Sequence, residues 1–333
     1  MIEIMAKTTK TRILILSDTH GEKFPESHYP QIKADVAIHC GDMTEQSKLS
    51  EFHITLDLLK TLDAPLKLVI AGNHDFTLDL PIFKQKIAQA GLEGEPGLVA
   101  REYGQYGEVR QLFDEAREFH NIHLLDEGMH KFILANGATL SVYASPYTAS
   151  PTADWGYQFL PGDSHNFVID QGTDIAITHS PPEGVLDRSG AKKRIGIPDV
   201  FQAVEHARPK LHCFGHVHEG WGAKLVAWRD FDPSQKASYF TAIDNGQSMS
   251  LDTLASFRRG KFDDEDTAAA KSARLAGFES QGCRPTSHCV GDDHPIVSGK
   301  HTLFVNASIS GDPAMPFHLP WLVDLDLPLQ ELK

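Results

Sequence analysis

The sequence lacks any run of 18 or more apolar residues, which excludes a transmembrane helix. The first apolar stretch, residues 13–16, is too short for the core of a signal peptide. Cysteines are few, four in 333 residues, and Cys283 and Cys289 are not spaced like the ligands of a zinc knuckle. We therefore expect a reduced, cytoplasmic protein without a membrane partner.

Basic residues are also scarce. Lysine and arginine total 31 against 45 acidic residues, giving a net charge of −14, which argues against a long nucleic acid as a partner. The hydrophobic and charged fractions, 41% and 23%, are those of a globular protein and exclude a disordered chain. Histidine is the residue in excess, with 18 copies, and it is both the commonest metal ligand and the usual proton carrier near neutral pH.

Short apolar runs alternate with segments of helical periodicity. The runs predict buried strands at residues 12–17, 35–39, 66–71, 121–125, 174–178 and 210–214. Helices are predicted at residues 49–61 and 106–119. Asn136-Gly137 between two apolar runs predicts a hairpin, so the fold class is α/β with mixed rather than purely parallel sheets.

The chain is interpreted as a single domain over residues 1–333, with a core at 12–227 and 301–328. Residues 228–300 are rich in Asp, Ser, Gly and Ala, and we expect an irregular insertion with one short helix near Glu265. Because this segment follows directly after His218, we hypothesise that it forms a lid over the site.

Polar residues follow five of the predicted strands. These strand ends read Ser17-Asp18-Thr19-His20, His39-Cys40-Gly41-Asp42, Gly72-Asn73-His74-Asp75, Thr178-His179-Ser180 and Gly215-His216-Val217-His218. In open α/β sheets, sites form outside the carboxyl ends of the strands, so we expect these side chains to meet in one crevice.

The donors in this set are carboxylate, amide and imidazole groups, with no thiolate. Such donors suit Mn²⁺, Fe, Zn²⁺ or Mg²⁺ rather than Cu(I) or an iron–sulfur cluster. Seven donors are too many for one zinc ion and are natural for two divalent metals that share a carboxylate. Two neighbouring metals typically clamp the attacking and leaving oxygens of a phosphoryl transfer.

In order and spacing, these motifs resemble the full set of the calcineurin-like metallophosphoesterases. The phrases around Asn73, His179 and His216 further resemble the metallophosphoesterase-domain-containing branch of that superfamily. The resemblance covers residues 12–226 and resumes at 301–328. It implies a four-layer αββα sandwich of two mixed sheets flanked by helices.

The resemblance also implies roles for the site residues. One metal would be held by Asp18, His20, Asp42 and His218, and the second by Asp42, Asn73, His179 and His216, with Asp42 bridging. A hydroxide bridging the two metals would attack phosphorus. His74 would stabilise the transition state or protonate the leaving oxygen, and Asp75 would orient His74 through its other ring nitrogen. Manganese is the metal expected first.

Five further residues are candidates for substrate binding. Trp155 and Tyr157 could form an aromatic platform, and Trp221 beyond the last motif could do the same, although core packing accounts for these rings equally well. Lys193 and Arg194 follow the His179 loop and could meet a substrate phosphate, with a solvated charge run as the plainer interpretation.

The leading hypothesis is therefore a metal-dependent phosphodiesterase acting on a small phosphodiester, such as a cyclic nucleotide. The preference for a diester comes from the resemblance. A phosphomonoesterase acting on a metabolite or phosphoprotein is the alternative, and a binding scaffold without turnover is the third hypothesis. The oligomeric state is left open.

Overall fold

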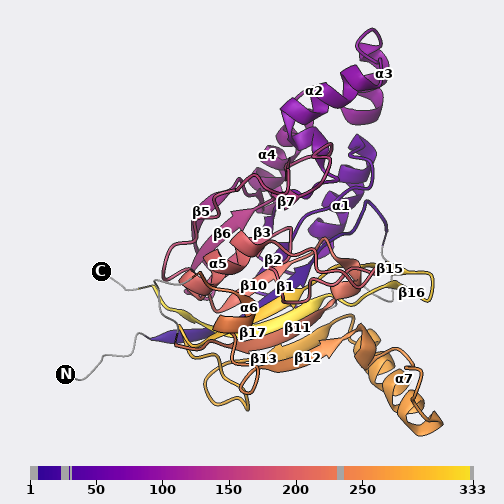
Figure 1. Cartoon of the computed structure of the whole chain (residues 1–333). Helices are drawn as coiled ribbons and strands as arrows, with labels where there is room; N and C mark the ends of the chain where they lie inside the picture. Colours follow the sequence, from indigo (N-terminus) through magenta and orange to yellow (C-terminus); the bar gives the residue numbers. More distant parts are fainter. Residues whose placement is uncertain (1–6, 24–29, 31, 231–235, 331–333) are drawn as a thin grey trace.

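Two β-sheets lie face to face at the centre of the molecule, with helices on their outer surfaces (Figure 1). The computed structural model describes residues 7–23, 30, 32–230 and 236–330. This architecture confirms the predicted four-layer sandwich of two mixed sheets flanked by helices.

The first sheet has six strands in the order β13-β17-β1-β2-β3-β4. They are β1 (Thr8–Leu16), β2 (Val36–His39), β3 (Leu66–Val69), β4 (Ile122–Leu124), β13 (Arg284–Ser287) and β17 (Trp321–Pro328). Strands β1 to β4 run parallel, and β17 runs antiparallel to β1. The predicted strands at 12–17, 35–39, 66–71 and 121–125 all lie here.

The second sheet has seven strands in the order β12-β11-β14-β10-β9-β6-β5. They are β5 (Gly128–Ile133), β6 (Thr139–Ser145), β9 (Ile175–Thr178), β10 (Leu211–Phe214), β11 (Gly222–Ala227), β12 (Met249–Thr253) and β14 (His301–Asn306). Strands β6, β9, β10 and β14 are parallel, and β5 pairs antiparallel with β6 as the Asn136-Gly137 hairpin predicted. Two small ladders join β7 (Thr148–Ala149) to β8 (Gln158–Phe159) and β15 (Ser310–Asp312) to β16 (Met315–Phe317).

Alternation along each strand produces the layers. On β1, Ile13 and Ile15 enter the core between the sheets, whereas Leu14 and Leu16 face the helical side. Helices α1 (Leu49–Thr61) and α4 (Glu108–His120) pack on the first sheet, and α5 (Pro198–Ala207) packs on the second. Helices α2 (Leu80–Gln89) and α3 (Pro96–Tyr103) contribute to a separate cluster at one end of the molecule (Figure 1). Three short 3₁₀ helices are η2 (Phe76–Leu78), η3 (His218–Gly220) and η4 (Leu254–Ser256).

Residues 228–300 are more regular than we expected. They contain α6 (Tyr239–Ala242), β12, η4, α7 (Glu265–Glu279) and β13. Strand β12 pairs with β11 at the edge of one sheet, and β13 pairs with β17 at the edge of the other. The expectation of an irregular segment was wrong because edge strands can be short and polar, and backbone pairing holds them without an apolar run.

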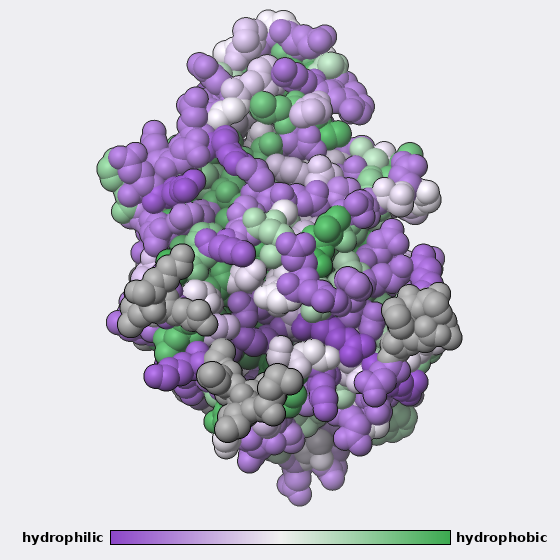
Figure 2. All heavy atoms as spheres, turned by 90° about the vertical axis from the view of Figure 1, so that its left-hand side faces the viewer, coloured by the Kyte–Doolittle hydropathy of each residue, from purple (hydrophilic) through white to green (hydrophobic). Residues whose placement is uncertain are grey.

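The surface is predominantly hydrophilic on the face drawn in Figure 2, where hydrophobic residues form small separated patches. Patches of this kind are ordinary on a globular protein and mark no extended apolar interface on that face. Within the described ranges, no helix combines the length and apolar character needed to cross a membrane.

Candidate metal centre

The side chains predicted as metal ligands meet where the parallel strands of both sheets end. Asp18, His20 and His218 form one group whose ligand atoms all lie within 4.8 Å of one another. Asp42, His179 and His216 form a second such group, and Asn73 Oδ1 lies 3.2 Å from His179 Nε2. The sequence therefore predicted correctly which residues come together.

The backbone at this edge adopts an unusual conformation. Four of the seven predicted ligands have positive φ angles, between 48° and 66°, and they are Asp18, His20, Asp42 and His216. Left-handed φ is uncommon outside glycine and costs free energy, and residues held in this way cluster at functional sites. The turns after β1, β2 and β10 thus aim these side chains into the crevice at a local energetic cost.

Two glycines make room for the carboxylates. A Cβ at Gly72 would lie 2.3 Å from Asp42 Oδ1, and a Cβ at Gly215 would lie 2.1 Å from Asp18 Oδ2. Neither distance is compatible with a side chain, so the glycine before Asn73 and the glycine before His216 allow the close approach of the carboxylates.

The donor set fits divalent cations, as the contacts of His179 demonstrate. Its Nδ1 lies 2.8 Å from the carbonyl of Cys40, to which it donates, so Nε2 is the nitrogen that carries the lone pair whenever the ring is neutral. This nitrogen faces two further acceptors, Asp42 Oδ2 and Asn73 Oδ1, each at 3.2 Å. These three atoms need a positive charge between them, which a proton on Nε2 or a bound cation in its place would supply.

The pKa values reflect the same crowding of acceptors. Burial opposes the charged form of His179, but Asp42 outweighs it and raises the pKa of His179 to about 9. Burial lowers the pKa of His216 to about 4, which keeps its ring neutral. Burial would raise the pKa of Asp18, but the adjacent His218 holds that pKa well below its usual range. The carboxylates are therefore ionised and His216 is unprotonated, as metal ligation requires.

His74 lies beside the predicted ligands rather than among them. Its backbone N–H donates to Asp42 Oδ1 at 2.8 Å, and its Nδ1 donates to the carbonyl of Glu45 at 2.7 Å. The ring meets His20 edge-on, with 4.9 Å between centroids, and lies 4.5 Å from the ring of Trp155. Nε2 of His74 is thus the nitrogen left for chemistry, and Trp155 supports the ring.

The predicted role of Asp75 was wrong. Its carboxylate does not hydrogen-bond to the His74 ring but accepts from the backbone N–H groups of Gly72, Met43 and Thr44, at 2.8 to 3.2 Å. It also accepts from the Thr44 hydroxyl at 2.8 Å. These turn amides are buried and need an acceptor, so Asp75 folds back onto them and joins the Asp42 loop to the Asn73 loop. The carbonyl of Glu45 orients His74 instead.

Glu45 is a site residue that the sequence reasoning missed. Its Oε2 lies 2.9 Å from His20 Nδ1, a close contact that is not aligned as a hydrogen bond. A carboxylate this close favours the tautomer with the proton on Nδ1 and the lone pair on His20 Nε2, which lies 3.3 Å from His218 Nε2. Its position three residues after Asp42 in the same loop was the available signal.

Replacing Glu45 with glutamine should therefore weaken metal binding about 10- to 100-fold, because the carboxylate that fixes the His20 tautomer is lost. Titration of the metal-free protein with Mn²⁺, followed by calorimetry, measures this change. Glu118→Gln, on the exposed side of α4, is the matched control. Equal affinities for Glu45→Gln and wild type would contradict this role.

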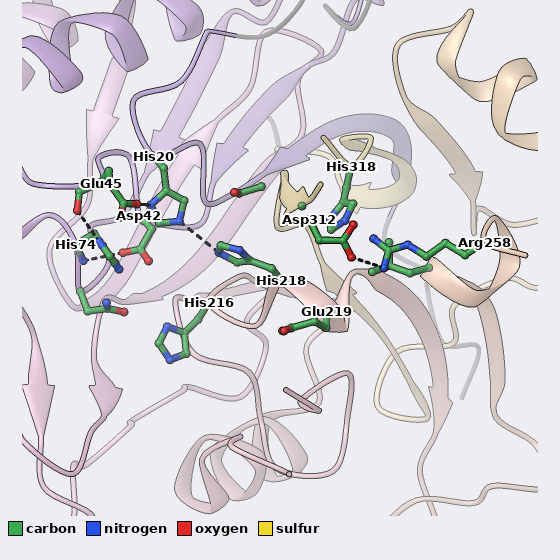
Figure 3. A pocket seen from close by; sticks show the side chains of 14 residues that line it. His20, Asp42, Glu45, His74, His216, His218, Glu219, Arg258, Asp312 and His318 are labelled. Carbon is green, nitrogen blue, oxygen red and sulfur yellow. Dashed lines mark hydrogen bonds and ion pairs between the residues drawn. The ribbon is translucent and has the colours of Figure 1, made fainter. Parts of the chain in front are cut away.

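A pocket of about 420 Å³ opens in front of the candidate ligands (Figure 3). His20, Asp42, Asn73, His74, His216 and His218 line one side. The other side carries residues that the sequence did not single out: Glu219, Leu254, Arg258, Ser310, Gly311, Asp312 and His318. Leu254 and Arg258 come from the insertion, which therefore supplies part of the wall.

None of the five predicted substrate-binding residues is among the residues that line this pocket. Arg194 donates to Asp187 Oδ1 and lies over the ring of Tyr239, so its charge is already paired. Lys193 is exposed to solvent. Tyr157 is half-buried, its ring meets Tyr147 edge-on, and burial raises the pKa of its hydroxyl. Substrate contacts for these three remain predictions.

The prediction that Trp221 binds substrate was wrong. Its ring is 1% exposed in the core between the sheets, 5.1 Å from the ring of Trp321. Its Nε1 donates to the carbonyl of Leu319 at 2.8 Å. Strand β11 begins at the next residue and carries the ring inward, so the core interpretation is the correct one.

We accordingly expect Trp221→Ala to lower the free energy of unfolding by about 3–5 kcal/mol, the usual cost of emptying a buried aromatic site. Urea unfolding measures the loss. Trp155→Ala, at a half-buried ring, should cost less stability. A Trp221→Ala variant with wild-type stability and a raised KM would restore the substrate-platform interpretation.

Comparison with known proteins agrees with the fold. Residues 11–220, more than half of the chain, match the sequence model of the calcineurin-like phosphoesterases, and the chain belongs to that family. The human metallophosphoesterase domain-containing protein 1 is 33% identical over 219 residues, which cover 64% of this chain and 62% of the relative. The UPF0046 protein T07D4.2 of Caenorhabditis elegans is 29% identical over 246 residues, covering 69% and 57%.

These similarities place the chain in the metallophosphoesterase-domain-containing branch of the family. The chain spans about three fifths of the length of these relatives. The family model ends at residue 220. The pocket-lining residues beyond it lie outside the matched segment, and they are Leu254, Arg258, Ser310, Gly311, Asp312 and His318.

Proposed function

We propose that the protein is a metal-dependent phosphodiesterase that hydrolyses a small phosphodiester. The observation that carries the proposal is the convergence of seven ligand side chains around one crevice, with His74 beside them at the wall of the pocket. The pocket volume, about 420 Å³, falls in the range of sites for small molecules. The net charge of −14 further disfavours a long nucleic acid as substrate.

Asp18, His20, Asp42 and His218 would hold one metal, and Asp42, Asn73, His179 and His216 the other. When bound, the two metals would activate a water for attack and offset the charge that develops on the phosphoryl oxygens. The protein holds the ligands at fixed positions through the turns described above. His74, oriented by the Glu45 carbonyl, keeps Nε2 available to donate a proton or a hydrogen bond to the leaving oxygen.

The charge of the pocket rim favours a diester over a monoester. Among the residues that line the pocket, Glu45, Glu219 and Asp312 contribute carboxylates outside the predicted ligand set, against the single guanidinium of Arg258. A phosphomonoester carries nearly two negative charges at neutral pH, whereas a diester carries one. The acidic rim repels the dianion more strongly.

Hydrolysis of bis-p-nitrophenyl phosphate and p-nitrophenyl phosphate tests the proposal, with Mn²⁺, Zn²⁺, Mg²⁺ and Fe²⁺ added in turn to metal-free protein. We expect kcat/KM for the diester to exceed that for the monoester at least about tenfold, and Mn²⁺ to give the highest rate. A reversed ratio would identify a phosphomonoesterase. Binding of inorganic phosphate without turnover of either ester would identify a scaffold.

A further inference from the structure

The pocket has a second wall, opposite the predicted metal ligands, that the proposed chemistry does not use (Figure 3). Three segments build it. The insertion supplies Leu254 and Arg258, the region of the β15–β16 hairpin supplies Ser310, Asp312 and His318, and η3 supplies Glu219. A phosphodiester extends on both sides of its phosphorus, so a substrate held at the ligands must place its second substituent toward this wall.

Arg258 is the only lysine or arginine among the residues that line the pocket. Its Nη1 donates to Asp312 Oδ2 at 2.8 Å, and its side chain is 33% exposed. Nε is enclosed and has no hydrogen-bond partner, which leaves the terminal nitrogens as the donors that a ligand can reach. Figure 3 shows the guanidinium end pointing from the insertion toward Asp312 at the pocket.

Hydrogen bonds fix both the backbone of Arg258 and the carboxylate with which its side chain pairs. Its backbone N–H donates to the carbonyl of Leu254 at 3.0 Å, and its own carbonyl accepts from Lys271 Nζ at 3.2 Å. Asp312 is fixed in turn, since its Oδ1 accepts from the N–H groups of Ala314 and Met315 at 3.0 and 3.1 Å. A donor fixed in this way loses little conformational entropy when it binds a ligand.

The charges near Arg258 select what it can bind. The guanidinium is neutralised by Asp312, and the exposed carboxylate of Glu219 on the same side of the pocket leaves a net negative charge. A second phosphate or a carboxylate would be repelled there, whereas neutral oxygen acceptors would still receive hydrogen bonds.

We propose that Arg258 is a specificity-determining residue that donates hydrogen bonds to an uncharged, oxygen-rich substituent of the substrate, such as the nucleoside part of a nucleotide diester. Asp312 acts as its positioning residue. This inference rests on the proposed function, because it concerns the substituent that the hydrolytic site does not cleave.

Calorimetric binding to Mn²⁺-loaded protein tests the proposal with three probes. Thymidine 5′-monophosphate and phenyl phosphate share a phosphate and differ in the polar substituent, and thymidine 3′,5′-bisphosphate adds a second phosphate. We expect wild type to bind the monophosphate about tenfold more tightly than phenyl phosphate, since one hydrogen bond to a charged donor has that effect. The bisphosphate should bind more weakly than the monophosphate.

Arg258→Gln should remove the tenfold preference and change phenyl phosphate binding less than twofold. Arg259→Gln is the matched control, because its neighbouring guanidinium pairs with Glu265 at the surface and does not line the pocket. Asp312→Asn should shift the relative affinity toward the bisphosphate, because the charge on Arg258 is no longer neutralised.

The proposal would be overturned if Arg258→Gln weakened the binding of thymidine 5′-monophosphate and of phenyl phosphate by the same factor. It would also be overturned if the wild-type protein bound these two probes with equal affinity. Tighter wild-type binding of the bisphosphate would also overturn it. Hydrolysis of bis-p-nitrophenyl phosphate in the same preparations keeps the two hypotheses apart. If no hydrolysis were detected, the proposed phosphodiesterase activity would be contradicted. The ratios of probe affinities test the role of Arg258 independently of turnover.

Discussion

Asp42→Asn should lower kcat/KM for bis-p-nitrophenyl phosphate by about 10³-fold or more. Asp42 is 2% exposed and is the carboxylate predicted to be shared by both metals. Its Oδ1 accepts from the backbone of His74, and its Oδ2 faces His179 Nε2 at 3.2 Å. The amide keeps the shape but removes the charge, and the transition-state stabilisation that two metals provide amounts to several kcal/mol, each 1.36 kcal/mol being tenfold in rate.

Elemental analysis of the Asp42→Asn protein should find a metal content below that of wild type. Asp57→Asn is the control, because that carboxylate is exposed on α1 and pairs with Lys60 at the surface. Circular dichroism of each variant shows whether the fold is retained. A folded Asp42→Asn protein with wild-type rate and metal content would refute the assignment of this residue.

His74→Gln should lower kcat by about 10²- to 10⁴-fold, the usual contribution of a positioned acid or base. The ring lies outside the predicted ligand set, and its Nδ1 is engaged by the Glu45 carbonyl. Loss of Nε2 therefore removes the group that we propose donates to the leaving oxygen. Metal content should stay at the wild-type value, which separates this variant from Asp42→Asn.

The matched control is His53→Gln, on the exposed side of α1, which should leave the kinetics unchanged. The role of His74 can also be checked with leaving groups of different acidity. Diesters with poor leaving groups should lose more rate in His74→Gln than diesters with p-nitrophenol. A uniform loss across leaving groups would indicate that His74 only positions the substrate.

The arrangement of the site was predictable because one feature of the sequence determined it. Each candidate ligand follows a short apolar run, and parallel strands bring their carboxyl ends to the same edge. The glycines at 72 and 215 carried further information, since the structure places carboxylate oxygens where their side chains would be. Helix α1 was predicted with its correct bounds from the spacing of Phe52, Leu56 and Leu59.

The remaining features depend on contacts between segments distant in sequence. The carboxylate of Asp75 is adjacent to His74 along the chain, but buried amides from the Asp42 loop compete for it and hold it. Trp221 follows a motif at the site, yet its ring packs on Trp321, one hundred residues later. Arg258 reaches the pocket only because β12 and α7 fix the insertion beside it. No local periodicity encodes such contacts.

The pairing of residues 228–300 with both sheets also bears on association between copies of the chain. Strand β12 covers the edge of β11, and β13, with Pro285 in its short run, covers the edge of the eight-residue β17. Unpaired strand edges are templates for intermolecular β-pairing, and a short edge strand containing proline blunts them. A chain from which residues 228–300 are deleted would therefore expose the edges of β11 and β17 and become prone to aggregate.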